Sequence, residues 1–257
     1  MLNTLKGMGI AVSRPVSQAT KLNALIREND GEPISFPLID IVPLQDYTTF
    51  DNTIKALETT DWAIFISSNA VQNGMPRLVA QYSKLPSGLK FAAIGPVTAS
   101  ELMQMGAQQV LIPKNRFDSE SLLSLPEMQG MQGKKVMIFR GVGGREVLAD
   151  TLQTRGAKVT FAECYRRINP QTSCLALAQL WQNQQLHAIV VTSSEAMRYL
   201  LEMTHHGNDD WIRHIKICVN HARIAEEAVG LQVSVADAPG DAAMLTCLRT
   251  ALSKGVA

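Results

Sequence analysis

The sequence has almost no net charge and lacks long apolar runs. Lys and Arg number 24 against 23 Asp and Glu, so the formal charge of +1 provides no overall field to attract nucleic acid or a membrane surface. No apolar run reaches the roughly 18 residues that a membrane helix needs. The segment 1–7 has no apolar core of a secretory signal, and we therefore expect a cytoplasmic protein.

The sequence also lacks the common motifs of metal, redox and nucleotide chemistry. Its four cysteines form no CxxC pair and no zinc-ligand spacing, as expected for reduced thiols in a cytosolic protein. His205 and His206 lie in a polar stretch that is typical of an exposed loop. There is no HExxH, no GxSxG and no nucleotide fingerprint. The absence of these motifs predicts chemistry that uses neither a metal nor a cofactor.

An internal repeat organises the 257 residues, a length that suits two ordinary domains. Residues 63–69 resemble residues 188–194 at an offset of 125 (188 − 63), and residues 91–94 match 216–219 at the same offset. Near the start, Arg14 ends a segment that matches the one ending at Arg140, 126 residues later. An ordered series at nearly constant spacing predicts that the chain is a duplication.

Each half alternates short apolar strands with helical patterns. Residues 10–13 and 91–94 are β-rich runs of the kind found in buried parallel strands. Residues 19–28 place apolar side chains on one helical face. This rhythm predicts two doubly wound α/β lobes, with the chain crossing between them near 36–43 and 161–168.

The candidate site residues follow the predicted strands. In parallel sheets, ligands bind beyond the carboxyl ends of the strands. Backbone amides at helix starts, hydroxyl groups and arginines bind carboxylates well. These features predict a cleft for a polyanionic ligand, with the following candidate residues: Arg14, Ser67, Ser68, Asn69, Gly95, Thr98, Arg140, Gly141, Arg145, Thr192, Ser193 and Ser194.

Several of these positions have a second interpretation. Ser67 and its neighbours also suit a plain helix cap, and the Gly143-Gly144 pair also suits an ordinary turn. Arg14 and Arg140 also suit solvated strand ends, although their equivalent repeat positions favour a shared role.

The same segments resemble, in order, the motifs of the uroporphyrinogen-III synthase family over essentially the whole chain. The segments that carry the resemblance are Ser13-Arg14-Pro15, Phe65-Ile66-Ser67-Ser68-Asn69-Ala70-Val71, Ile94-Gly95-Pro96-Val97-Thr98-Ala99, Arg140-Gly141 with Gly144-Arg145-Glu146, and Tyr165-Arg166. The resemblance implies two similar doubly wound parallel-sheet (flavodoxin-like) lobes from an internal duplication, joined by a two-strand linker. One lobe would comprise residues 1–36 and 168–257, the other residues 42–162, with crossing strands at about 36–42 and 161–168.

The resemblance also implies a function. The substrate would be hydroxymethylbilane, closed to uroporphyrinogen III with loss of water and inversion of ring D, without a cofactor. Tyr165 would donate a hydrogen bond or proton to the departing hydroxyl group. The alternative is that Tyr165 is a half-buried strand aromatic. The expected protein is a monomer that receives its substrate from the preceding bilane-forming enzyme and binds no nucleic acid or membrane.

One turn departs from the family pattern. At the offset of 125, Arg223 occupies the position of Thr98, and the glycine, proline and threonine of this motif are absent from the second half. Arg223 is therefore expected either to bind a carboxylate or to point to solvent. A rival hypothesis for the whole chain is a two-lobed cytoplasmic module that binds a small anionic ligand without turnover, because a fold does not dictate a function.

Overall fold

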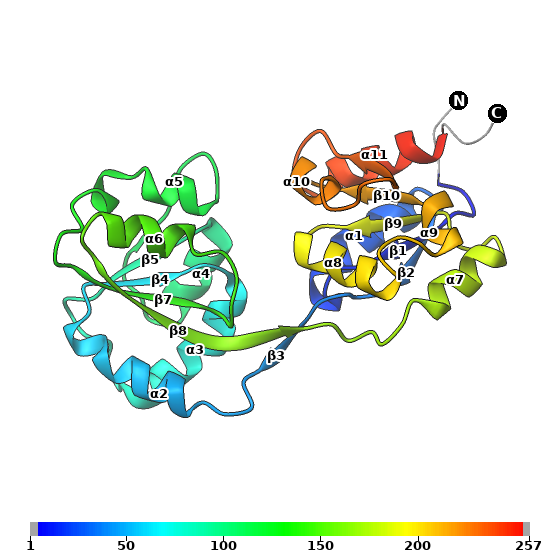
Figure 1. The fold of residues 1–257 in the computed structure, drawn as a ribbon. Coiled ribbons are helices and arrows are strands. Elements are labelled where there is room, and N and C mark those ends of the chain that lie inside the picture. The colour runs from blue at the N-terminus through cyan, green and yellow to red at the C-terminus, as the bar shows by residue number, and fades with distance from the viewer. Residues whose placement is uncertain (1–4, 254–257) are drawn as a thin grey trace. The chain divides into compact units, whose positions relative to one another are not determined.

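The computed structural model describes residues 5–253, so part of the segment 1–7, which has no apolar core of a secretory signal, lies outside the described residues. The chain divides into two compact units (Figure 1). Unit 1 contains the chain up to Asp40 and again from Ile168 onward, and unit 2 is Ile41–Arg167. The chain therefore enters unit 2 at the start of one strand and leaves it at the end of another.

Unit 1 contains a parallel sheet with the strand order β11-β10-β9-β1-β2. Counted along the chain, this is the order 2-1-3-4-5 of a flavodoxin-like sheet, whose strand order reverses between β1 and β9. Its strands are β1 (Gly9–Val12), β2 (Glu32–Ser35), β9 (Ala188–Val191), β10 (Lys216–Val219) and β11 (Gln232–Val235).

The helices of unit 1 cover both faces of this sheet (Figure 1). Helices α1 and α11 share one core cluster with Val12, Val190 and Cys218, which are neighbours on three adjacent strands. The helices are α1 (Val16–Glu28), α7 (Leu175–Gln182), α8 (Ser194–Met203), α9 (Asp210–His214), α10 (Ala222–Ala225) and α11 (Asp241–Ser253).

Unit 2 contains a sheet with the order β3-β8-β7-β4-β5-β6. Its strands are β3 (Asp40–Pro43), β4 (Trp62–Phe65), β5 (Lys90–Ala93), β6 (Val110–Leu111), β7 (Lys135–Gly141) and β8 (Lys158–Ile168). Its helices are α2 (Thr48–Ile54), α3 (Ser68–Gln81), α4 (Pro96–Gln104), α5 (Ser119–Leu123) and α6 (Val147–Thr154), with the 3₁₀ turns η1 (Lys55–Thr59) and η2 (Pro126–Met128).

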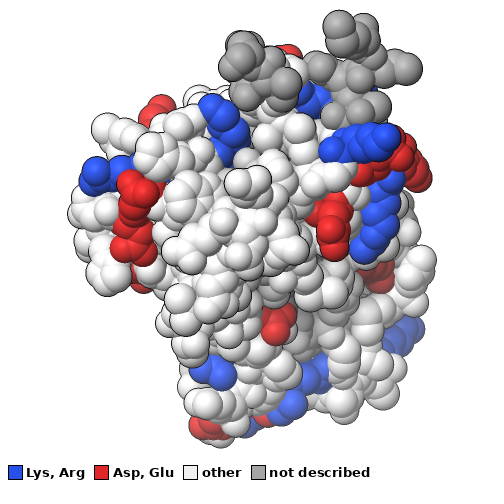
Figure 2. All heavy atoms as spheres, turned by 90° about the vertical axis from the view of Figure 1, so that its right-hand side faces the viewer, with Lys and Arg blue, Asp and Glu red and all other residues white. Residues whose placement is uncertain are grey.

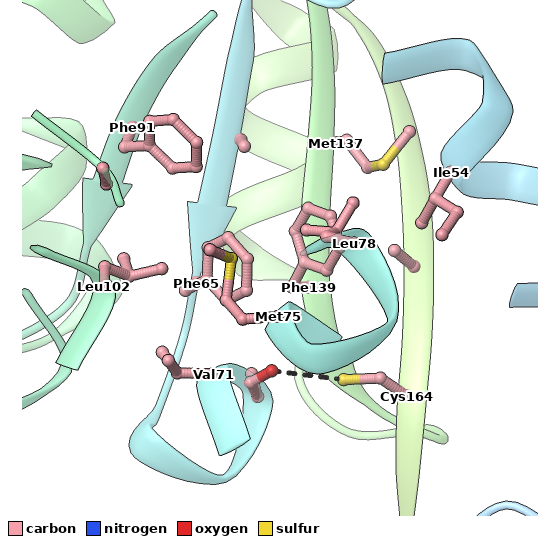
Figure 3. Packing of buried hydrophobic residues seen from close by; sticks show 14 of the residues in the cluster. Ile54, Phe65, Val71, Met75, Leu78, Phe91, Leu102, Met137, Phe139 and Cys164 are labelled. Atoms are coloured by element: carbon pink, nitrogen blue, oxygen red, sulfur yellow. Dashed lines mark hydrogen bonds between the residues drawn. The ribbon is translucent and has the colours of Figure 1, made fainter. Parts of the chain in front are cut away.

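The central strands β4 and β7 of the second sheet are buried on both faces, to which their successive residues point in turn. Phe65 and Phe139 stack with ring centroids 4.2 Å apart and pack beside Met75 of α3 (Figure 3). Ile64 and Ile138 belong to the other core cluster, which contains residues of α6. Two apolar faces explain why these strands are continuous hydrophobic runs in the sequence.

The two sheets place corresponding strands in the same order, β2-β1-β9-β10-β11 in unit 1 and β8-β7-β4-β5-β6 in unit 2. A duplication predicts such a match, and a common origin of the two halves stays a prediction. The strand register corrects the offset of the repeat. Ala188 pairs with Ile10, whereas Trp62 pairs with Val136, so the counterpart of Trp62 is Ala188 at an offset of 126 (188 − 62).

Helix starts confirm this one-residue correction. Ser67 and Ser193 are both N-caps, of α3 and α8, and Gly95 and His221 occupy the same position before α4 and α10. The counterpart of Arg223 is therefore Val97, which is 66% exposed, and the comparison of Arg223 with Thr98 was wrong. Small apolar residues match at an offset of either 125 or 126, whereas the hydrogen-bonded register of the strands fits only 126.

The described surface carries mixed charge. On the face drawn in Figure 2, basic and acidic side chains are interspersed among uncharged ones, and neither sign dominates. None of the helices within residues 5–253 combines the length and the apolar character needed to cross a bilayer.

Candidate active site

The predicted site residues lie at the carboxyl ends of the strands in both units. Ligands of open α/β sheets bind where the strand order reverses, which is between β1 and β9 in unit 1 and between β7 and β4 in unit 2. Arg14 and Thr192 follow the first pair of strands, whereas Gly141 and Ser67 end or follow the second pair. Each unit thus has its own candidate edge, defined here as the unit 1 edge and the unit 2 edge.

At the unit 1 edge, Arg14 is held by side chains from two other segments. Its Nε donates to Thr192 Oγ1 over 3.3 Å, and its Nη1 lies 2.5 Å from Asp241 Oδ1. The Arg14 and Asp241 side chains are only 14% and 15% exposed. Arg14 is therefore part of a largely buried ion pair, and the interpretation as a solvated strand end is wrong.

Three polar side chains of unit 1 without hydrogen-bond partners follow the strands β1, β9 and β10 of its sheet. Ser13 Oγ, Ser194 Oγ and Asn220 Oδ1 are buried and make no hydrogen bond within the described residues. Ser193, by contrast, is the N-cap of α8, and its Oγ accepts from Ala196 N over 3.1 Å. Buried polar atoms in native proteins are normally satisfied, so three orphans near one strand edge suit a place where a polar ligand binds.

At the unit 2 edge, Tyr165 lies beside the start of α3. Its hydroxyl is 3.4 Å from Ser67 Oγ, which in turn accepts from Ala70 N over 3.2 Å. Tyr165 is 3% exposed. A phenol, a hydroxyl and a helix N-terminus thus converge on one point of the sheet edge.

Gly141 makes this position of the phenol possible. The β7–β8 register shifts between Arg140 and Gly141, so that Gly141 pairs with Tyr165. A Cβ atom on Gly141 would lie 2.5 Å from the Tyr165 ring, closer than real Cβ contacts allow. Irregularities of this kind redirect side chains next to functional sites.

Arg140 is directed at its own loop. It is 3% exposed, its guanidinium lies 4.5 Å over the Phe161 ring, and its Nε donates to Gly141 O over 3.2 Å. Its Nη2 donates to Gly143 O. Gly143 N in turn donates to Glu163 Oε1 over 3.0 Å, so the side chains of buried Arg140 and partly exposed Glu163 both bond the glycine-containing turn.

The thiol of Cys164, which precedes Tyr165 in the sequence, is not a reactive nucleophile. Burial raises the pKa of Cys164 to about 12. Its Sγ lies 3.6 Å from the carbonyl oxygen of Ala70 (Figure 3). Because the thiolate is the nucleophilic form of cysteine, Cys164 is a packing residue at this edge.

The other predicted residues occupy varied positions. Ser68 and Asn69 form the first turn of α3, and Gly95 is the N-cap of α4 with an extended backbone that any residue adopts. Thr98 is 6% exposed inside α4, and Arg223 is exposed on the four-residue helix α10.

Arg145 lies on the surface. It forms an ion pair of 2.7 Å with Glu120, at 57% and 51% side-chain exposure. Hydrogen bonds from the Glu120 backbone amide and from Arg145 lower the pKa of the Glu120 carboxyl. Arg145 therefore stands apart from the hydrogen bonds that connect Tyr165 and Ser67.

Sequence reasoning missed Asp241 and gave no role to Asn220 or Glu163. Asp241 follows Pro239-Gly240, a sequence that predicts a helix start. The structure has α11 begin at Asp241. Nothing in the local pattern links it to Arg14, because the two residues are 227 positions apart. Across the part of the chain that the structure describes, no group of three or more His, Cys, Asp or Glu side chains could hold a metal ion.

Comparison with known proteins identifies the family. The family model described as uroporphyrinogen-III synthase HemD matches residues 20–246. The chain belongs to the uroporphyrinogen-III synthase family. Among curated members, the uroporphyrinogen-III synthase of Escherichia coli strain K12 is 35% identical over 246 residues, covering 94% of this chain and 100% of the relative. The Salmonella typhimurium member is 32% identical, with the same coverage.

Solved structures of this family share the fold. A mutant uroporphyrinogen III synthase from the extremely thermophilic bacterium Thermus thermophilus superposes with a TM-score of 0.66 at 17% identity, covering 96% of this chain and 99% of that one. The uroporphyrinogen-III synthetase of Helicobacter pylori 26695 gives 0.54, also at 17% identity, covering 96% and 99%. At this identity the likeness shows the two-domain α/β fold.

Proposed function

We propose that this chain is a lyase that cyclises hydroxymethylbilane to uroporphyrinogen III, with loss of water and inversion of ring D, in tetrapyrrole biosynthesis. The observation that carries the proposal is the family match over residues 20–246. The relative from Escherichia coli, matched over its full length, carries the name of this activity. Family membership also favours an enzyme over the rival binding module without turnover.

Each strand edge offers groups that would bind carboxylates of the bilane. Helix N-termini present backbone amides that bind anions, and Arg14 adds a guanidinium at the unit 1 edge. We propose that the following residues bind the substrate: Arg14, Ser67, Ser68, Asn69, Gly95, Gly141, Arg145, Thr192, Ser193, Ser194 and Arg223. Buried Arg140 and Thr98 would act indirectly, by holding the β7–α6 loop and the first turn of α4.

Tyr165 would act on the leaving group. Its phenol donates a hydrogen bond, or the proton itself, to the terminal hydroxyl as the carbon–oxygen bond breaks and water departs. Ser67 Oγ, 3.4 Å away, orients the phenol. The resulting azafulvene cation is reactive, so the remaining task is to hold the bilane folded for attack through the spiro intermediate rather than direct closure.

The chemistry of the reaction indicates whether a redox cofactor is needed and how the substrate is supplied. Loss of water and formation of a carbon–carbon bond leave the oxidation level of the tetrapyrrole unchanged, so we propose that no redox cofactor takes part. Hydroxymethylbilane closes spontaneously to isomer I, which favours direct hand-over from the bilane-forming enzyme. We further propose that the protein acts in the cytoplasm as a monomer.

One assay tests the activity. The protein is mixed with freshly made hydroxymethylbilane, and the porphyrins obtained by oxidation are resolved into isomers I and III. We expect isomer III in proportion to the protein added, whereas heat-denatured protein yields isomer I. Isomer I alone from folded protein would contradict the proposed activity.

A further inference from the structure

We infer that Asp241 is a positioning residue, which orients the Arg14 guanidinium toward a carboxylate of the substrate. The inference rests on the proposed function. It concerns a carboxylate that lies at the first residue of α11 and comes close to Arg14 only in the folded chain.

Two contacts fix the plane of the guanidinium. Thr192 Oγ1 accepts from Nε over 3.3 Å, and Asp241 Oδ1 lies 2.5 Å from Nη1. Within the described residues, Nη2 makes no hydrogen bond, and it is the nitrogen left for a ligand. Because an arginine binds a carboxylate through a fork of fixed geometry, rotation of this plane changes what the free nitrogen can reach.

The carboxylate itself is held rigidly. Asp241 opens a 13-residue helix, where the partial positive charge of the helix N-terminus favours an acidic side chain. Met244 and Leu248 of the same helix are fully buried in the core of unit 1. A residue placed by a packed helix holds its partner more precisely than one on a loop.

Because the Arg14 side chain is largely buried, its position depends on the ion pair with Asp241. At 14% exposure, the guanidinium has little water to replace a lost partner, and a buried charge without its counter-ion moves or destabilises its surroundings. Asn220, with its unpartnered Oδ1, directly follows β10, as Thr192 directly follows the adjacent β9, since Val219 pairs with Val191. The free guanidinium nitrogen and this amide therefore belong to one strand edge, where a substrate carboxylate has polar groups to meet.

The test is steady-state formation of isomer III by Asp241→Asn. We expect KM to rise about tenfold while kcat changes by less than about twofold, because substrate binding is weakened without touching the leaving group. The matched control is Glu227→Gln, which breaks a more exposed ion pair with Arg198 in the same unit, 3.2 Å long. The control should leave KM unchanged, and the melting temperature of each variant separates a folding defect from a binding defect.

A double-mutant cycle decides whether Asp241 acts through Arg14. In an Arg14→Gln background, Asp241→Asn should change KM by less than about twofold, since the residue it positions is gone. If Asp241→Asn leaves KM unchanged or lowers it, or if it raises KM equally in both backgrounds, the inference is wrong.

A second variant keeps the test available if Asp241→Asn fails to fold. Asp241→Glu keeps the charge and moves it by one methylene, so we expect KM to rise about threefold with kcat unchanged. An unchanged KM would overturn the inference. Because wild-type protein is assayed in parallel, isomer I alone from the wild type would instead reject the proposed function.

Discussion

Arg14 and Arg140 occupy corresponding positions in the two units, yet their surroundings differ completely. Arg14 bonds Thr192 and Asp241, which come from distant segments, and it retains one unused nitrogen within the described chain. Arg140 is more deeply buried and donates to carbonyl groups of its own loop. Position in the repeat therefore predicts where a side chain lies along the sheet, whereas its partners depend on which segments pack over that position.

The two edges also differ in chemical character. The residue after Arg14 is Pro15, which precedes α1, whereas the residue after Arg140 is Gly141, against which the Tyr165 ring packs. The unit 1 edge thus contributes a charged pair, and the unit 2 edge contributes a phenol. The two matching sheets therefore carry different functional groups at corresponding edges.

Replacing Arg14 and Arg140 one at a time gives the largest expected effects and tests whether the two arginines have different roles. We expect Arg140→Leu to lower the free energy of unfolding by about 3 kcal/mol, because the buried carbonyl group of Gly141 and the partly exposed one of Gly143 lose a charged donor. Arg14→Gln should cost less stability and act mainly on KM. Urea denaturation and isomer III kinetics measure the two effects.

If Arg140→Leu instead raised KM without loss of stability, Arg140 would be a ligand-binding residue like Arg14. The supporting role assigned to it here would then be wrong.

The next largest effect is expected from Gly141→Ala. The new Cβ would push against the Tyr165 ring, so we expect a loss of about 2 kcal/mol in stability and a lower kcat. Gly130→Ala is the matched control, because nothing lies within 4 Å of the added atom and its φ is not in the left-handed region. Equal stability and kcat in the two variants would show that the glycine does not place the phenol.

Removal of the phenol oxygen tests the chemistry of the unit 2 edge directly. Tyr165→Phe keeps the ring in the core, so we expect folding to be retained and kcat to fall about tenfold, in keeping with loss of one proton or hydrogen-bond donor. Circular dichroism checks the fold, and single-turnover assays of isomer III check the rate. An unchanged rate would remove Tyr165 from the mechanism.

Much of the fold was predictable because its signals are local. Residues 10–13 and 91–94 were expected as strands, and the structure has β1 at Gly9–Val12 and β5 at Lys90–Ala93, each shifted by one residue. Uninterrupted apolar runs identify a buried strand but not its first residue. The helix expected at 19–28 begins earlier, at Val16, because Pro15 already stands at its N-cap position.

The candidate site was less predictable because its contacts are non-local. The sequence placed Arg14 and Thr192 after strands, and strand pairing brought them within hydrogen-bonding distance. It contained no signal that Asp241 would reach the same arginine, or that Arg140 would turn onto Phe161. Both outcomes depend on how helices and loops pack over a strand end, which local patterns do not encode.

The smallest expected effect offers the closest comparison of the two edges, because Ser67 and Ser193 perform the same local task. Each is the N-cap of its helix and accepts from the amide three residues later, so Ser67→Ala and Ser193→Ala should each cost about 1 kcal/mol of stability. Hydrogen exchange in the first turns of α3 and α8 measures this loss.

The activities of these two serine variants should separate. Only Ser67 has its Oγ 3.4 Å from the Tyr165 hydroxyl, so Ser67→Ala should also lower kcat by about threefold, while Ser193→Ala should act on KM if at all. Equal changes in kcat would mean that the serine beside the phenol serves only as a cap. An effect confined to Ser67→Ala would mean that unit 2 uses its helix cap to orient the proton donor, a role that the matching cap in unit 1 does not share.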